Sequence, residues 1–336
     1  MLYVGLDAHW RQSSFCVLDG QGRKVLSRTV QGRWSKVLEE VGRVGRPFAI
    51  CFEASTGYGY LYDGLRKITR RVVVAHPGQL RLIFRSKRKN DRADAEKLAK
   101  LLYLDAVPPI HAPSSEVRSW RRMIGHRQKL IGDRARVKNN IRAMLRSQGV
   151  SAPRGLWSRR GEEWLETAEL SAELDMVQRD VLLERLRAIR AMIERVEREL
   201  NRVASRHPGV ELLKTIPGVG NRTAEAVVAW VDDPWRFRRV SRIGSYFGVV
   251  PSQDASGPVN RLGHITREGP SVVRGLLAEA AWQAIRRSDQ VRSFYERVRR
   301  GDDERRKIAL VATVHYLLRV MLTMLQTGEV WRDETS

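Results

Sequence analysis

The order of short apolar runs in the first 75 residues constrains the fold of this chain most strongly. Five runs of strand length alternate with two stretches of helical spacing. The runs of strand length are residues 2–6, 13–18, 24–30, 48–52 and 71–75. Residues 35–44 and 57–68 have helical spacing, and turn residues at 19–22 separate the second run from the third. The sequence therefore predicts a meander of three strands followed by helix, strand, helix and strand.

This element order is that of the ribonuclease-H-like fold, so we expect an α/β N-terminal domain. Asp7 and Glu53 each end a predicted central strand, and Asp91 and Asp94 begin a predicted helix over residues 91–104. Residues three apart on a helix lie on one face. In a ribonuclease-H-like fold these four carboxylates converge at one edge of the sheet.

Carboxylates that converge repel one another, and a divalent cation removes this repulsion. Two Mg²⁺ ions could activate a nucleophile there and stabilise a leaving oxygen on a phosphodiester. The predicted metal ligands are Asp7, Glu53, Asp91 and Asp94. Each acid alone also has an ordinary explanation, since Asp91 and Asp94 suit a helix N-terminus. Glu96 and Asp105 are weaker candidates, and His9 fits a structural or substrate-facing role better than that of a ligand.

The net charge indicates a polyanionic partner. The chain has 61 Lys and Arg against 38 Asp and Glu, a formal net charge of +23. Residues 81–148, a predicted basic loop and a long helix, carry 18 basic and 6 acidic residues, which makes nucleic acid the leading partner class. A GC-rich genome also raises the Arg content without any binding role. The candidate contacts are Arg85, Lys87, Arg88, Lys89, Arg121, Arg122, Arg127, Lys129, Arg134 and Lys138.

Two further patterns organise the second half of the chain. Apolar residues from Leu182 to Val203 are spaced alternately four and three apart, a heptad seam that predicts coiled-coil pairing within or between chains. An amphipathic helix packed on its own domain has the same pattern. Residues 216–220 (Ile-Pro-Gly-Val-Gly) match a helix-hairpin-helix, in which Gly218 and Gly220 let a DNA phosphate approach. A plain helical turn is the alternative.

Length and composition bound the remaining expectations. The 336 residues suggest a first domain over 1–150, a coiled coil over 160–206 and a C-terminal domain over 207–330, with a Ser- and Gly-rich loop at 252–263. Only two Cys are present, which excludes a disulfide framework and fits a reducing cytoplasm. The apolar run 308–325 contains a His and an Arg, so we expect a buried helix and no membrane association.

Short motifs spread over nearly the whole chain match one family. They are residues 3–7 (Tyr-Val-Gly-Leu-Asp), 52–57 (Phe-Glu-Ala-Ser-Thr-Gly), 89–95 (Lys-Asn-Asp-Arg-Ala-Asp-Ala), 216–220, 248–251 (Gly-Val-Val-Pro), 255–257 (Ala-Ser-Gly), 261–263 (Arg-Leu-Gly) and 265–269 (Ile-Thr-Arg-Glu-Gly), followed by Arg274. In this order they resemble the DEDD transposases of insertion sequences. The family is the one-ten insertion-sequence family, which includes the Piv-type DNA invertase.

The resemblance implies a RuvC-like N-terminal domain that carries the acidic tetrad and a transposase domain at the C-terminus. It also implies a catalytic serine, which maps best onto Ser256, with Ser252 as the fallback. Family members often have Ser-Ser-Gly where this chain has Ala-Ser-Gly, which leaves Ser256 as the one hydroxyl of the triplet. Ser256 would attack a phosphodiester and form a covalent phosphoserine, so no nucleotide cofactor is needed.

The resemblance further implies a noncoding bridge RNA that pairs with target and donor DNA. Arg261 and Arg267 are additional candidate contacts to nucleic acid. The heptads and the need to handle four DNA strands predict a homodimer or a dimer of dimers, acting at the nucleoid of a bacterial cytoplasm.

Two other functions remain open at this point. A metal-dependent endonuclease of the Holliday-junction type would use the acids and water without a serine. A non-catalytic nucleic-acid-binding protein would carry a degenerate acid cluster. The presence of all four acids argues against the second alternative, and the region 207–336 argues against the first.

Overall fold

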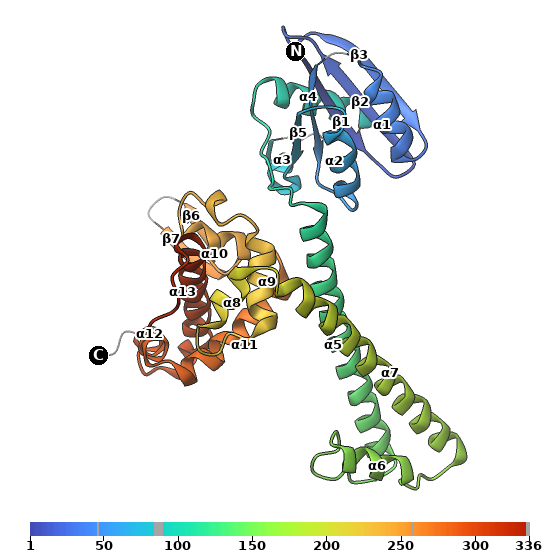
Figure 1. Cartoon of the computed structure of the whole chain (residues 1–336), viewed down its shortest axis with the longest axis vertical. Helices are drawn as coiled ribbons and strands as arrows, with labels where there is room; N and C mark the ends of the chain where they lie inside the picture. The colour runs from blue at the N-terminus through green and yellow to red at the C-terminus, as the bar shows by residue number, and fades with distance from the viewer. Residues whose placement is uncertain (46, 84–89, 257–258, 334–336) are drawn as a thin grey trace. The chain divides into compact units, whose positions relative to one another are not determined.

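A computed structural model describes residues 1–336 except 46, 84–89, 257–258 and 334–336 (Figure 1). The chain divides into two compact units, Met1–Arg118 (unit 1) and Ser119–Ser336 (unit 2). The border falls inside helix α5 (Ser115–Ser147), so most of this helix belongs to unit 2. The predicted division into three domains instead placed the whole helix in the first domain.

Unit 1 is a mixed α/β unit built on a five-stranded sheet of order β3-β2-β1-β4-β5. The strands are β1 (Leu2–Ala8), β2 (Gln12–Leu18), β3 (Lys24–Gln31), β4 (Phe48–Glu53) and β5 (Arg71–Ala75). The helices are α1 (Trp34–Gly42), α2 (Tyr58–Arg66), α3 (Pro77–Ile83) and α4 (Asp91–Tyr103). The predicted order of strands and helices is confirmed. The prediction of a loop over 81–90 is wrong at its start, because α3 continues through Ile83.

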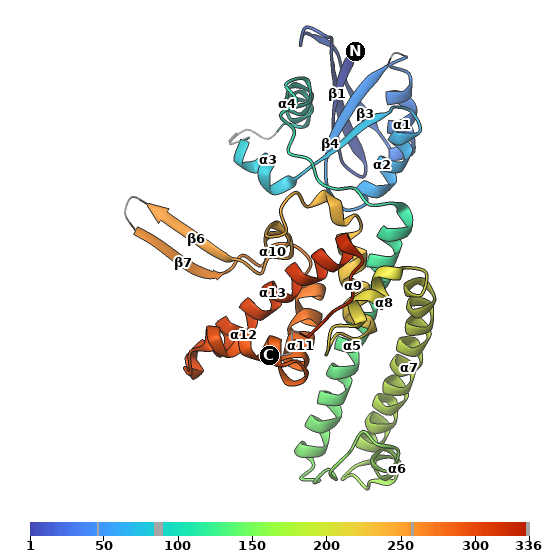
Figure 2. The same ribbon diagram turned by 60° about the vertical axis from the view of Figure 1, so that its left-hand side comes forward.

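The pleat of the strands sorts their side chains onto two faces of the sheet. Phe48, Ile50 and Phe52 pack in the core formed with α1 and α2, whereas Ala49 and Cys51 pack against α4. Figure 2 shows α1 and α2 on one side of the sheet and α4 on the other. Because β1 runs parallel to β4 in register, Asp7 and Glu53 end neighbouring strands at the same edge and belong to the α4 side.

Gly5 sets how closely α4 approaches β1. A Cβ atom at Gly5 would lie 2.1 Å from the carbonyl oxygen of Ala95 and 2.2 Å from the amide nitrogen of Ala99. The backbones of strand and helix are therefore in direct contact, and only glycine fits at this position.

Unit 2 is mostly helical. Its elements beyond α5 are α6 (Arg159–Thr167), α7 (Glu173–Ala204), α8 (Pro208–Lys214), α9 (Asn221–Val231), α10 (Arg242–Phe247), β6 (Pro251–Ser256), β7 (Val259–Ile265), α11 (Ser271–Arg287), α12 (Asp289–Arg299), α13 (Arg306–Thr327) and two short 3₁₀ helices, Pro234–Arg236 and Asp303–Arg305. The sequence predicted α5, α7 and the buried helix α13, and it missed α6.

The heptad seam on α7 packs within the chain. Leu182, Leu186, Ile189 and Ile193 are buried in one cluster with Val137, Ile141 and other residues of α5. Figures 1 and 2 both show α5 and α7 side by side, closed at one end by α6. The seam therefore covers a neighbouring helix of the same chain, which was one of the alternatives that the sequence left open.

The segment predicted as a loop at 252–263 is a two-stranded hairpin, so that prediction is wrong. β6 pairs antiparallel with β7, and Ser256 pairs with Val259. The strands contain Asp, Asn, Gly and Pro and lack an apolar face, which explains why no strand pattern was visible in the sequence.

Among the described residues, one helix, Asp303–Thr327, is long and apolar enough to cross a membrane. Within unit 2 this helix contributes Leu317, Leu318, Met321 and Leu322 to the main core. It is a core helix of the unit, as the sequence predicted.

Candidate functional site

An acidic cluster lies at the edge of the sheet where β1 and β4 end. Ligand atoms of Asp7, His9 and Asp91 all lie within 4.8 Å of one another. Asp7 comes from β1, and Asp91 is the first residue of α4, which Asn90 caps by accepting a hydrogen bond from the Arg92 amide. The close approach of α4 at Gly5 thus brings the start of the helix beside the end of the strand.

The other three predicted acids act electrostatically on Asp7. The pKa of Asp7 is raised, first by burial and then by repulsion from Asp91, Asp94 and Glu53, while His9 lowers it. His9 Nε2 lies 3.4 Å from Asp7 Oδ2. The cluster therefore concentrates negative charge around one partly buried carboxylate. The carboxylate oxygens of the cluster are the donors that a divalent cation such as Mg²⁺ prefers, whereas the imidazole of His9 is not a typical Mg²⁺ ligand.

The remaining acids differ in their partners. Asp94 Oδ1 pairs with Lys97 Nζ at 2.7 Å, and Glu53 is exposed. Glu96, a weaker candidate, forms ion pairs with Lys24 and Lys100. The other weaker candidate, Asp105, pairs with Arg71. Glu96 and Asp105 therefore have cationic partners of their own.

Several basic residues predicted to bind nucleic acid have partners inside unit 2. Arg121 donates to the carbonyl oxygens of Ala229 and Trp230, at 2.7 and 3.2 Å. Arg127 forms an ion pair with Glu197 of α7 at 2.5 Å. These contacts tie α5 to α9 and α7, which the prediction of nucleic-acid contacts did not foresee.

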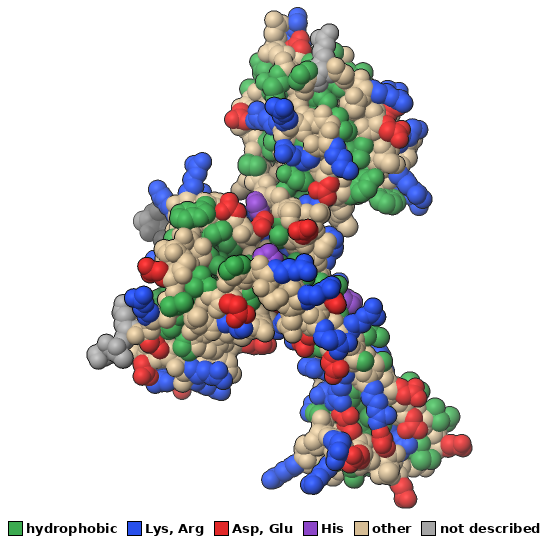
Figure 3. All heavy atoms as spheres, viewed as in Figure 1, with side chains coloured by type: hydrophobic (Ala, Val, Ile, Leu, Met, Phe, Trp, Pro, Cys, Tyr) green, Lys and Arg blue, Asp and Glu red, His purple; other side chains and the backbone are tan. Residues whose placement is uncertain are grey.

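Other predicted contacts remain exposed or lie outside the described residues. Lys138 lies over the ring of Trp157 at 4.7 Å, and burial lowers its pKa. The exposed or partly exposed cations are Arg122, Lys129, Arg134, Arg261 and Arg267. Figure 3 shows Lys and Arg side chains on the surfaces of both units, mixed with acids along α5 and α7. The four predicted contacts Arg85, Lys87, Arg88 and Lys89 lie outside the described residues.

The two glycines of the predicted helix-hairpin-helix have different surroundings. Gly218 has a positive φ of 89°, and a Cβ there would lie 2.5 Å from the Ala284 amide nitrogen of α11. Gly220 is the N-cap of α9, and a Cβ atom added at this position would have no atom of another residue within 4 Å. Gly218 thus packs against a helix, and Gly220 leaves the N-terminus of α9 accessible.

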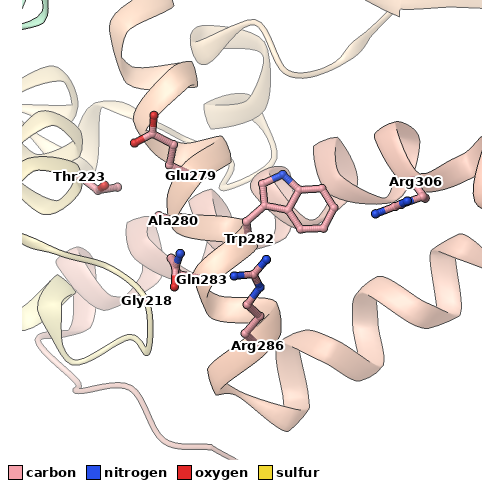
Figure 4. A pocket seen from close by; sticks show the side chains of 8 residues that line it. All are labelled: Gly218, Thr223, Glu279, Ala280, Trp282, Gln283, Arg286 and Arg306. Carbon is pink, nitrogen blue, oxygen red and sulfur yellow. The ribbon is translucent and has the colours of Figure 1, made fainter. Parts of the chain in front are cut away.

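A basic cavity of unit 2 was not found from the sequence. Its volume is about 640 Å³, and its lining residues are Gly218, Thr223, Glu279, Ala280, Trp282, Gln283, Arg286 and Arg306. Figure 4 shows the Trp282 indole between the side chains of Arg286 and Arg306. Neither guanidinium group has a hydrogen-bond or ion-pair partner within the described part of the chain. The lining residues are spread along the chain from Gly218, which precedes α9, to Arg306 at the start of α13, so local spacing in the sequence gave no signal.

Ser256 is the last residue of β6. It pairs with Val259 across the hairpin. Ser256 belongs to unit 2, whereas the acidic cluster belongs to unit 1.

Comparison with known proteins gives concordant results over both units. A family model described as a transposase (the DEDD transposase of IS110) matches residues 4–148. A second, described as the transposase IS116/IS110/IS902 family, matches residues 210–296. The transposase for insertion sequence element IS1111A of Coxiella burnetii is 26% identical over 289 residues, which are 84% of this chain and 78% of that protein.

Two more relatives extend this result. A probable family 20 transposase of Pseudomonas aeruginosa is 26% identical over 250 residues, or 71% of this chain and 72% of the relative. The transposase for insertion sequence element IS1328 of Yersinia enterocolitica is 25% identical over 240 residues, or 70% of each chain.

Proposed function

The chain belongs to the IS110 family of insertion-sequence transposases, and on this premise we propose that it cuts and rejoins DNA through its acidic cluster and Ser256. In this proposal unit 1 is a RuvC-like catalytic domain. Two Mg²⁺ ions would be held by Asp7, Glu53, Asp91 and Asp94. The observation that carries the proposal is the convergence of these carboxylates around the partly buried Asp7.

The residues of the cluster have distinct tasks. Divalent cations held there would neutralise the carboxylates and polarise a phosphodiester. Asp7 is held by β1 and is partly buried, while Asp91 enters from α4, whose distance from β1 is set at Gly5. His9, 3.4 Å from Asp7, orients that carboxylate and faces the substrate.

Ser256 supplies the nucleophile. Its Oγ forms a bond to phosphorus, the bond from phosphorus to the leaving deoxyribose oxygen breaks, and the serine proton passes to the solvent or to that oxygen. Because a phosphodiester linkage is retained between DNA and protein, rejoining requires no nucleotide cofactor. The motif Ala-Ser-Gly at 255–257 and the hairpin that carries it support this assignment.

The test incubates the full chain with Mg²⁺, element DNA and element RNA and separates the products on a denaturing gel. Our proposal expects a covalent protein–DNA adduct that Asp7→Asn and Ser256→Ala abolish. Ser252→Ala, in the same strand, is the matched control and retains the adduct. Strand cleavage without an adduct would instead identify a metal-dependent endonuclease. Binding without cleavage would identify a non-catalytic nucleic-acid-binding protein.

The nucleic-acid partners are donor and target DNA and a bridge RNA from the same element. Base pairing of the RNA would supply sequence specificity, and the protein would hold the backbones through its cations. The surfaces that support this are the exposed cations of α5, Arg261 on β7 with Arg267 just after it, and the cavity with Arg286 and Arg306. Its place of action in this proposal is the bacterial cytoplasm, at the nucleoid.

Self-association uses a different face of α7 from the heptad seam, which α5 already covers. Leu174, Val177 and Val181 are exposed near the start of α7 at a spacing of three and four residues, and Met192 is exposed farther along the same helix. Figure 3 shows hydrophobic side chains reaching the surface along this helix. A second copy of the chain that covers these exposed side chains of α7 would form the dimer. Two such dimers could then form a dimer of dimers.

Light scattering tests this assignment. The double variant Val177→Lys/Val181→Lys is expected to lower the molar mass to that of a monomer. Val25→Lys, at an equally exposed position on β3, is the matched control and leaves the mass unchanged.

A further inference from the structure

Three aromatic rings lie beside the acidic cluster in unit 1. The rings of Trp10 and Trp34 meet edge to face with their centroids 5.3 Å apart. The rings of Trp34 and Tyr60 stack with centroids 6.3 Å apart and planes 27° from parallel. Trp10 is 62% exposed and Tyr60 is 55% exposed, although large aromatic side chains are normally covered.

Trp34 fixes this group against the two segments that follow Asp7 and Glu53. Its Nε1 donates a hydrogen bond of 2.9 Å to the carbonyl oxygen of His9, two residues after Asp7. Its six-membered ring packs on Gly57, where a Cβ would lie 2.6 Å from the ring, four residues after Glu53. The exposed faces of Trp10 and Tyr60 are therefore held in place relative to the acidic cluster.

Two exposed arginines are neighbours of the aromatic group along the chain. The Gly32 amide donates to the carbonyl oxygen of Arg11 at 2.8 Å, which brings the segments Trp10-Arg11 and Arg33-Trp34 together. Arg11 and Arg33 are exposed, and in the described residues neither guanidinium group has a partner. Aromatic rings interleaved with free cations are the pattern that binds single-stranded nucleic acid, since bases stack on the rings and phosphates pair with the cations.

We propose that Trp10 and Tyr60, held by Trp34, form a stacking platform for an unpaired nucleotide of the DNA strand whose phosphodiester lies at the acidic cluster. A base in a duplex is stacked on both faces, so the platform selects a nucleotide that has left the helix. The inference rests on the proposed function for the position of the phosphodiester. Stacking of one base implies that loss of the platform weakens binding by about 5- to 100-fold.

The experiment measures binding with the metal chelated, so it depends neither on cleavage nor on Ser256. The full-length protein binds a DNA duplex with one unpaired 2-aminopurine, or the same duplex fully paired, and both affinity and quenching of the 2-aminopurine fluorescence are recorded. Trp10→Ala is expected to lower the affinity for the unpaired site by about 5- to 100-fold and to abolish the quenching. Trp10→Phe, which keeps a ring, retains most of both.

Trp235→Ala is the matched control, because Trp235 is 70% exposed in unit 2. It is expected to change neither signal. An equal loss for paired and unpaired DNA, or an equal loss in Trp10→Ala and Trp235→Ala, would overturn the platform. A larger Trp10-dependent signal with the RNA version of the strand would overturn its assignment to DNA. If the adduct assay fails while Trp10-dependent quenching persists, the proposed chemistry is wrong and the platform stands.

Discussion

The Asp7→Asn variant is expected to be more stable than the wild type without metal and to lose the response to metal. In the folded protein Asp7 is partly buried and is repelled by Asp91, Asp94 and Glu53, which raises its pKa. A raised pKa means that the ionised carboxylate destabilises the fold above that pKa and that this penalty disappears as the pH falls through it. Asn has the same shape and no charge, so it removes the penalty at neutral pH.

The magnitude follows from the distances. Ligand atoms of Asp7 and Asp91 lie within 4.8 Å. Two unit charges at this separation repel by about 3 kcal/mol at an effective dielectric constant of ~20. Because solvent screens both partly exposed carboxylates, we expect the removal of this repulsion to raise the free energy of unfolding by about 1–2 kcal/mol. For a unit of this size the melting temperature would rise by about 4–8 °C.

The assay is thermal unfolding followed by circular dichroism, in EDTA and in about 10 mM Mg²⁺. For a site with a Kd of about 1 mM, Mg²⁺ stabilises the wild type by about 1.4 kcal/mol, and the variant shows little of this gain. Glu96→Gln is the matched control: it removes an acid of α4 that pairs with two lysines and leaves the Mg²⁺ response intact. A lower melting temperature of Asp7→Asn in EDTA, or equal Mg²⁺ responses in both proteins, would refute this reasoning.

Three further outcomes follow from the structure. Burial raises the pKa of Glu225 to about 7. As the pH rises from 5 to 8, the free energy of unfolding in urea should therefore increase by about 3 kcal/mol for Glu225→Gln relative to the wild type. Parallel curves of unfolding free energy against pH would contradict this. Gly57→Ala should destabilise unit 1 by about 1–3 kcal/mol, because the φ angle of Gly57 is +85° and the new methyl group would lie 2.6 Å from the indole of Trp34. An unchanged thermal unfolding curve would contradict this prediction. The double variant Arg286→Glu/Arg306→Glu should weaken DNA binding and reduce the slope of log K against log salt concentration by about 2. Arg185→Glu on α7 is the control and should change neither. An equal loss of DNA affinity in both variants would exclude the cavity as a DNA-binding site.

The sequence predicted unit 1 well because its strands are short runs rich in apolar residues. Asp7 and Glu53 could be assigned to one edge because each ends a run that the element order makes a central strand. The proximity of His9 to Asp7 was visible from the sequence, but the distance of 3.4 Å that makes it part of the cluster depends on side-chain packing.

Unit 2 was harder to predict for physical reasons. The hairpin at 251–265 has no apolar face, so nothing distinguished it from a loop. A run of Arg residues on α5 does not reveal which of them pair internally, and Arg121 and Arg127 find carbonyl and carboxylate partners more than 60 residues away. The cavity with Arg286 and Arg306 depends on how α11 and α13 pack, and local spacing carries no information about that.

The backbone contact at Gly5 has a consequence for the choice of metal ion. With no side chain between β1 and α4, the distance from Asp7 to Asp91 is set by two rigid backbones, and the site cannot expand easily around a larger ion. Mg²⁺ requires oxygen ligands at about 2.0–2.1 Å, whereas Ca²⁺ takes more ligands at about 2.3–2.6 Å. In the proposed metal site, discrimination between Mg²⁺ and Ca²⁺ by size is therefore expected to depend on Gly5, two residues before Asp7, where only glycine fits.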